Sequence, residues 1–301
     1  MELLHLRSRK STHHGFHVKV ANFFSKKGYL NLRGHQVWSQ QWNTFRKNSE
    51  PVLLLHGGLS STQSWDYTIL PTVKKHQVFA YDRSAHGRTG SREGFYHFDF
   101  QTDEAIAYIE DVVKAPVHLI GWSDGGIISL MIALKRPDLV RSIVSIGTNF
   151  HWNSGLPFNE QKEEEQEIVI SDEDRARFAK TSPDPAHMQE VIIRKAFDVW
   201  AKEPNMTPED LKKISCPVLV LTGDDEPFTN LHTVELYESL PNGRLAIIPG
   251  ASHFVVKEKT KLMQSMIVDF YKDMSFPITK WPRLRKERTE KLLEVLNEEE
   301  A

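Results

Sequence analysis

Ser123 stands in the stretch GWSDGG, with one glycine two positions before it and another two positions after it. A serine hydroxyl is a weak nucleophile until a base takes its proton, and a tight turn without flanking side chains can present it for reaction. The apolar run at 117–120 predicts a strand before the turn, and apolar residues spaced by three and four predict a helix after it. The pattern therefore indicates a strand-to-helix elbow with Ser123 as the candidate nucleophile.

A base and an acid for this serine occur after later apolar runs. His253 follows one such run across a short loop, and residues at the carboxyl ends of strands gather where ligands bind in open α/β sheets. Three consecutive acidic residues at 224–226 follow the preceding apolar run at 217–221, and both Glu226 and Asp225 are candidates for the acid. We expect Ser123, His253 and one of these two carboxylates to converge as a catalytic triad.

Donors for an oxyanion are expected at the end of the apolar run 52–55, where the sequence reads HGGL. One donor is the backbone amide of Gly58 or of Leu59, and the other is the amide of Asp124. Losing one such donor typically costs about 3 kcal/mol of transition-state stabilisation. His56 is expected to brace this loop rather than to react.

The elements that must position these residues alternate between strand and helix. Short runs that are apolar throughout favour strands of a parallel sheet covered on both faces. An amphipathic helix is expected between the second and third runs, with Thr102 as its capping residue. The sequence therefore predicts an α/β fold. The six predicted strands are 52–55, 78–81, 117–120, 142–146, 217–221 and 245–248.

This alternation breaks between about 150 and 214, where the chain becomes polar and helical. Helices inserted into a series of strands commonly form a cap over a binding site. The charged last part of the chain is interpreted as a helix that packs one leucine face on the body. The predicted organisation is an N-terminal extension at 1–26, an α/β core at 27–149 and 215–273, a helical cap at 150–214 and a charged C-terminal tail at 274–301.

Aromatic residues near the predicted site favour a substrate with a hydrophobic part. The expected partner is a small molecule, and no cofactor and no metal site are expected. The candidate substrate-binding residues are Trp122, Phe228, Phe254, Phe150 and Trp152.

Composition and charge argue against several other classes of protein. The chain has 301 residues and a formal net charge of -2, which argues against a dedicated nucleic-acid binder. Cys216 is the only cysteine, so stability must come from packing. No early apolar segment reads as a signal peptide, and no window approaches a membrane span. We therefore expect a cytoplasmic protein that binds no membrane and is a monomer or a homodimer.

Taken together, the motifs resemble those of serine hydrolases with the α/β-hydrolase fold, over about residues 27–271. They are HGG at 56, DRSAHGRTG at 82, GWSDGG at 121, CPVLVLTGDDEPF at 216 and GASHF at 250. The resemblance implies a mostly parallel sheet of about eight strands flanked by helices, with an inserted helical cap. It also implies that Glu226 is the triad acid, although most relatives carry aspartate there, with Asp225 as runner-up. For the DRSAHGRTG turn, the resemblance implies a structural role.

The GWSDGG elbow is similar to that of the biphenyl hydrolase-like group, which includes enzymes that cleave amino-acid ester prodrugs. Because position 123 is serine rather than aspartate, the resemblance excludes epoxide hydrolases and haloalkane dehalogenases. It implies hydrolysis of a small or medium carboxylic ester through an acyl-enzyme. The alternatives on the same triad are a carbon–carbon bond hydrolase, a lactonase and a cofactor-free haloperoxidase. A non-enzymatic alternative is a small-molecule receptor that retains the triad.

Overall fold

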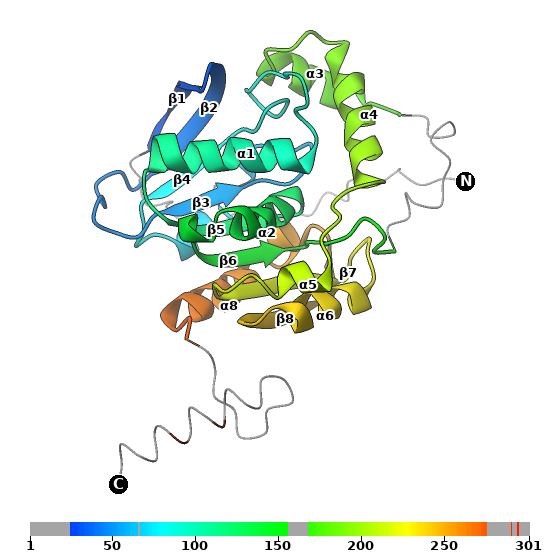
Figure 1. Ribbon diagram of the computed structural model, residues 1–301. Coiled ribbons are helices and arrows are strands. Elements are labelled where there is room, and N and C mark those ends of the chain that lie inside the picture. Colours follow the sequence, from blue (N-terminus) through cyan, green and yellow to red (C-terminus); the bar gives the residue numbers. More distant parts are fainter. Residues whose placement is uncertain (1–24, 66, 156–167, 276–289, 291–293, 295–301) are drawn as a thin grey trace, which may run out of the picture.

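The computed structural model describes residues 25–65, 67–155, 168–275, 290 and 294 (Figure 1). An eight-stranded sheet in the order β1-β2-β4-β3-β5-β6-β7-β8 forms its centre. The pairs from β4 to β8 are all parallel, and β1 and β2 form an antiparallel hairpin that joins β4 at one edge. The strands are β1 Ser25–Leu32, β2 His35–Trp42, β3 Val52–Leu55, β4 Val78–Tyr81, β5 Val117–Trp122, β6 Val140–Ile146, β7 Val218–Asp225 and β8 Gly243–Ser252.

Helices connect these strands on both faces of the sheet. The α-helices are α1 Phe98–Tyr108, α2 Asp124–Lys135, α3 Asp172–Thr181, α4 Met188–Trp200, α5 Pro208–Leu211, α6 Asn230–Ser239, α7 Val255–Glu258 and α8 Thr260–Lys272. Four short helical turns complete the described elements. They are η1 Thr62–Trp65, η2 Leu70–Thr72, η3 Ile109–Val113 and η4 Pro137–Leu139.

The predicted fold class is confirmed, because the sheet is mostly parallel and is covered on both faces. Alternate residues of β3 show why its run is apolar throughout. Leu53 and Leu55 pack in a core with residues of α1 and α2. Val52 and Leu54 pack in a second core with residues of α8 and of the turns before β4. A strand with both faces buried favours an apolar side chain at every position, which explains the continuous apolar run of β3.

The edge hairpin of β1 and β2 was not predicted from the sequence. Along β2 buried and partly exposed residues are mixed, and the strand carries polar residues among its apolar ones. Half-exposed antiparallel strands lack the continuous apolar run by which the central strands were found.

Helix α1 begins at Phe98, four residues before the capping residue that the sequence suggested. The reason is a contact from a distant part of the chain. Glu203 accepts a hydrogen bond from the backbone amide of Phe98, with N and Oε2 3.0 Å apart, and its other oxygen lies 2.8 Å from Nδ1 of His97. A carboxylate at the first turn satisfies an amide that a helix leaves unpaired. Thr102 is therefore inside the helix and buried.

The segment between β6 and β7 holds α3, α4 and α5, and Figure 1 shows α3 and α4 on the far side of α1 from α8. Its contacts with the rest of the protein include Asp184, whose carboxylate accepts from the amide of Ser91 at 2.8 Å. The assignment of 150–214 as a cap stays a prediction, and residues 156–167 lie outside the described part. Nearly all of the predicted extension at 1–26 and tail at 274–301 also lie outside it.

None of the helices in the described residues is long and apolar enough to span a membrane.

Candidate active site

Ser123 occupies a strained turn between β5 and α2. Its backbone has φ 54° and ψ −121°, which a residue with a side chain rarely adopts. Two hydrogen bonds hold the turn: the Ser123 amide donates to the Ile146 carbonyl at 2.8 Å, and the Gly126 amide donates to the Ser123 carbonyl at 2.8 Å. Strain of this kind persists only where the surrounding structure enforces it.

The flanking glycines are required by close backbone contacts. A Cβ atom on Gly121 would lie 2.1 Å from the carbonyl oxygen of Gly125. A Cβ atom on Gly125 would lie 1.8 Å from the carbonyl oxygen of Leu55. Both distances are far below van der Waals contact, so any side chain would separate β3, β5 and α2. The sequence-based explanation of these glycines is thereby confirmed.

The three side chains predicted to converge do so. Oγ of Ser123 lies 3.0 Å from Nε2 of His253, and Nδ1 of His253 lies 2.6 Å from Oε2 of Glu226. The carboxylate only accepts, so Nδ1 carries the proton and Nε2 is left to accept from the serine. The His253 side chain is one quarter exposed, whereas the Glu226 side chain has no exposed surface. The three side chains therefore form a continuous hydrogen-bonded series from Ser123 through His253 to Glu226.

The structure selects Glu226 rather than Asp225 as the partner of His253. The second carboxylate oxygen of Glu226 accepts from the Thr222 hydroxyl at 2.8 Å and from the Gly223 amide at 3.1 Å. Asp225 is exposed, and in the pairing of β7 with β8 it lies opposite Ser252. With three donors around it, the Glu226 carboxylate is fixed in place while its neighbour faces solvent.

Gly147 makes room for the longer glutamate, a feature that the sequence analysis missed. It follows β6 directly and has φ 55°. A Cβ atom there would lie 3.2 Å from Oε1 of Glu226 and 3.2 Å from Nδ1 of His253. The available signal was the glycine itself, because a residue without a side chain directly after a strand often marks a close approach.

The loop after β3 lies against the nucleophile. A Cβ atom on Gly57 would lie 3.3 Å from Cβ of Ser123. One on Gly58 would lie 2.6 Å from Oδ2 of Asp124 and 2.4 Å from a ring carbon of Trp200. Only a chain without side chains at 57 and 58 comes this close to the elbow. The assignment of the Gly58, Leu59 and Asp124 amides as oxyanion donors stays a prediction.

Asp124 is buried, and its carboxylate is held by two residues that the sequence analysis did not connect with it. Oδ1 accepts from the indole nitrogen of Trp200 in α4 at 3.1 Å, and Oδ2 lies 3.9 Å from Nη2 of Arg83. Burial raises the pKa of Asp124 above its usual value, and the guanidinium of Arg83 opposes that shift. Both partners come from distant segments, so local spacing gave no indication of them.

The five aromatic residues predicted to line a pocket fall into two groups. Trp122 is buried and donates from its indole nitrogen to the His253 carbonyl at 3.0 Å, so it braces the histidine loop. Rings of Phe228 and Phe254 lie 6.4 and 6.3 Å from the ring of His253, and Phe254 is 51% exposed.

The second group lies on the segment that follows β6. The ring of Phe150 stacks on that of His232 at 4.2 Å, and Trp152 lies beside His151. The role of all five residues in substrate binding stays a prediction.

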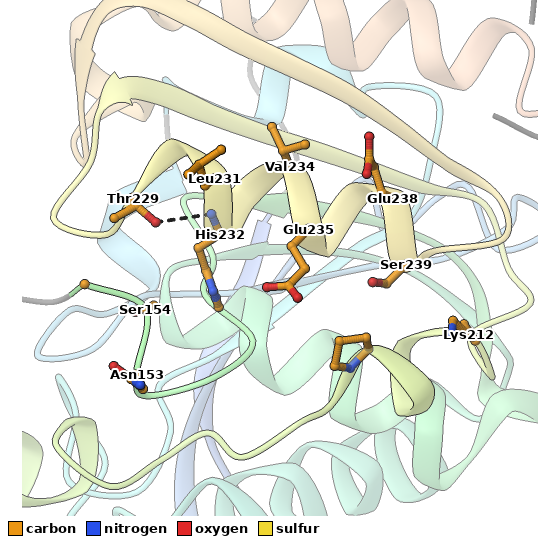
Figure 2. A pocket seen from close by; sticks show the side chains of 12 residues that line it. Asn153, Ser154, Lys212, Thr229, Leu231, His232, Val234, Glu235, Glu238 and Ser239 are labelled. Carbon is orange, nitrogen blue, oxygen red and sulfur yellow. Dashed lines mark hydrogen bonds between the residues drawn. The ribbon is translucent and has the colours of Figure 1, made fainter. Parts of the chain in front are cut away.

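A groove of about 630 Å³ runs along α6, and Figure 2 shows Thr229, Leu231, His232 and Glu235 at its wall. Ser123, Glu226 and His253 are not among its lining residues. Within the described part of the chain, no group of three or more histidine, cysteine or acidic side chains is arranged to hold a metal ion.

Comparison with known proteins identifies the family of this chain. The sequence matches the alpha/beta hydrolase family over residues 52–261, and the chain belongs to that family. It is 26% identical to the serine hydrolase BPHL of Mus musculus over 67% of this chain and 72% of that protein. It is 24% identical to a non-heme chloroperoxidase of Burkholderia pyrrocinia over 78% of this chain and 95% of that protein.

Solved structures show the same fold. A putative lipase from Acinetobacter baumannii AYE superposes with a TM-score of 0.68 and 17% sequence identity, over 83% of this chain and 92% of that one. The fold and family together make this protein an α/β hydrolase.

Proposed function

We propose that this protein hydrolyses a small or medium carboxylic ester through a serine acyl-enzyme. Ser123 attacks the carbonyl carbon while His253 takes its proton, and the Glu226 carboxylate stabilises the imidazolium. The amides of Gly58 and Asp124 bind the oxyanion that forms on the carbonyl oxygen. His253 then protonates the leaving alcohol and activates the water that releases the acid.

The hydrogen-bonded chain from Ser123 through His253 to Glu226 carries this proposal. Two neighbouring features support it. The glycine loop at 57–58 lies against the nucleophile, where an oxyanion would form. The exposed ring of Phe254 beside His253 favours a substrate with a hydrophobic part. The name of the mouse relative, a serine hydrolase, supports the same class of reaction.

Activity-based labelling tests the proposal directly. A fluorophosphonate is expected to modify the wild-type protein promptly and only at Ser123, as located by peptide mass spectrometry. A panel of p-nitrophenyl esters of increasing acyl length is expected to show turnover with an optimum among the short and medium chains. Absence of both labelling and turnover contradicts the proposal, and a ligand that then raises Tm favours a receptor.

Replacing Gly147 with alanine is expected to lower both stability and turnover. The left-handed backbone costs a residue with a Cβ atom about 1–2 kcal/mol. The added carbon also presses on Glu226 and His253, each 3.2 Å away, and so disturbs their alignment with Ser123. We expect kcat for p-nitrophenyl butyrate to fall by about tenfold or more, measured alongside urea unfolding.

Gly34→Ala is the matched control for this change. Gly34 also has a positive φ, of 94°, but a Cβ atom there would meet no atom within 4 Å. It is expected to lose stability while keeping kcat. If the two alanine variants show the same kcat, the crowding at position 147 has no catalytic consequence.

A further inference from the structure

Arg83 is a fully buried arginine in the loop after β4, within the turn to which the sequence assigned only a structural role. Its guanidinium donates to the backbone carbonyl of His56 through Nη1 and to that of Gly57 through Nη2, the latter at 3.2 Å. Nη2 also lies 3.9 Å from Oδ2 of Asp124. One side chain therefore reaches both segments that carry the predicted oxyanion donors.

The carbonyl of Gly57 has a second donor in His56. Nδ1 of His56 lies 2.8 Å from this oxygen, and Nε2 accepts from the Arg83 amide at 3.2 Å. An accepting Nε2 requires the proton on Nδ1, which is then donated to Gly57. Burial lowers the pKa of His56 well below its usual value, with Arg83 adding to the effect, so the ring stays neutral.

These two donors fix the direction of the Gly58 amide. In a planar trans peptide the C=O of residue 57 and the N–H of residue 58 point in opposite directions. Holding the Gly57 oxygen on Arg83 and His56 therefore holds the Gly58 N–H pointing away from them. Donors on a carbonyl also polarise the same amide and strengthen the hydrogen bond that its N–H gives.

Arg83 acts on Asp124 through charge. The Oδ2 atom of Asp124 is buried and has no hydrogen-bond partner among the described residues. The charge of the nearby guanidinium lowers the pKa of Asp124 against the effect of burial, together with the Trp200 hydrogen bond and the charge of His253. Without that charge the buried carboxylate at the first residue of α2, directly after the nucleophile, loses the ionic partner of its Oδ2 atom and keeps the Trp200 hydrogen bond on Oδ1.

We propose that Arg83 is a positioning residue that holds the Gly58 and Asp124 amides in register to bind the oxyanion. The inference rests on the proposed acyl transfer and deepens it. Arg83 touches neither the substrate nor Ser123. It sets the orientation of the 57–58 peptide and keeps the Asp124 carboxylate paired, so it contributes to the transition state more than to the bound ester.

The test compares Arg83→Lys with Arg92→Lys. Lysine keeps the positive charge, but its single ammonium does not reproduce the fork that holds two carbonyls. Arg92 belongs to the same loop and bonds to Glu104 and Ser84, away from the elbow. For p-nitrophenyl butyrate, we expect Arg83→Lys to lower kcat by about 10- to 100-fold with KM within about threefold. Arg92→Lys is expected to retain kcat within about twofold.

Equal kcat values in two folded lysine variants, checked by circular dichroism, overturn the inference. If Arg83→Lys does not fold, His56→Leu removes the other donor to the Gly57 carbonyl. His56→Leu is expected to lower kcat selectively, as predicted for Arg83→Lys. An unchanged kcat in His56→Leu overturns the inference.

A wild-type protein that hydrolyses no ester and is not labelled refutes the proposed function instead. The inference is then decided by a crystal structure of whichever of these two variants folds. The 57–58 peptide is expected to rotate from its wild-type orientation. An unrotated peptide overturns the inference independently of activity.

Discussion

Ser123→Ala is expected to lower kcat for ester hydrolysis by on the order of 10⁶-fold while the protein stays folded. The substitution removes the hydroxyl that lies 3.0 Å from Nε2 of His253 and that the proposed mechanism requires as nucleophile. Alanine bears the same strain at φ 54°, and the lost hydrogen bond is worth about 1 kcal/mol. Stopped assays of p-nitrophenyl butyrate, with urea unfolding on the same sample, measure both effects.

Ser145→Ala is the matched control. Ser145 is a buried serine of β6, and its hydroxyl has no hydrogen-bond partner among the described residues. Its loss is therefore expected to leave labelling and turnover near the wild-type level. Hydrolysis by Ser123→Ala at a rate close to that of this control contradicts the role of Ser123 as nucleophile.

The predictable parts of the fold are those in which burial produces a recognisable apolar pattern in the local sequence. The run at 52–55 is apolar on both faces because Leu53 and Leu54 enter different cores. The edge hairpin shows no such pattern, because its strands mix buried residues with partly or fully exposed ones. The start of α1 was misplaced for a related reason: its cap is Glu203, a residue 105 positions from Phe98.

The residues of the candidate site also differ in whether the sequence alone could reveal them. Ser123 and His253 could be found because each follows a strand-like run and carries a reactive side chain that packing alone does not require there. The choice between Glu226 and Asp225 needed the geometry, since both follow the apolar run of β7 and only one turns inward. The contacts of Gly147 and Arg83 could not be predicted, because Gly147 matters by lacking a side chain and Arg83 bonds to backbone atoms far along the chain.

Glu226→Gln is expected to lower kcat by about 10⁴-fold, the loss typical of an acid replaced by its amide in a triad. The glutamate fixes the proton of His253 on Nδ1, which leaves Nε2 free to accept from Ser123. An amide nitrogen facing Nδ1 stabilises the opposite tautomer, in which Nε2 carries the proton and Ser123 has no base. KM is expected to change little, because the Glu226 side chain lies behind the histidine and has no exposed surface.

Asp225→Asn is the matched control, since it makes the same chemical change one residue earlier on an exposed side chain. Its kcat is expected to stay within about twofold of the wild type. Raising the pH does not rescue Glu226→Gln if the defect is the tautomer, because the amide does not titrate in this range. If only Asp225→Asn is impaired, the acid has been assigned to the wrong residue, and the Glu226 contact serves the loop alone.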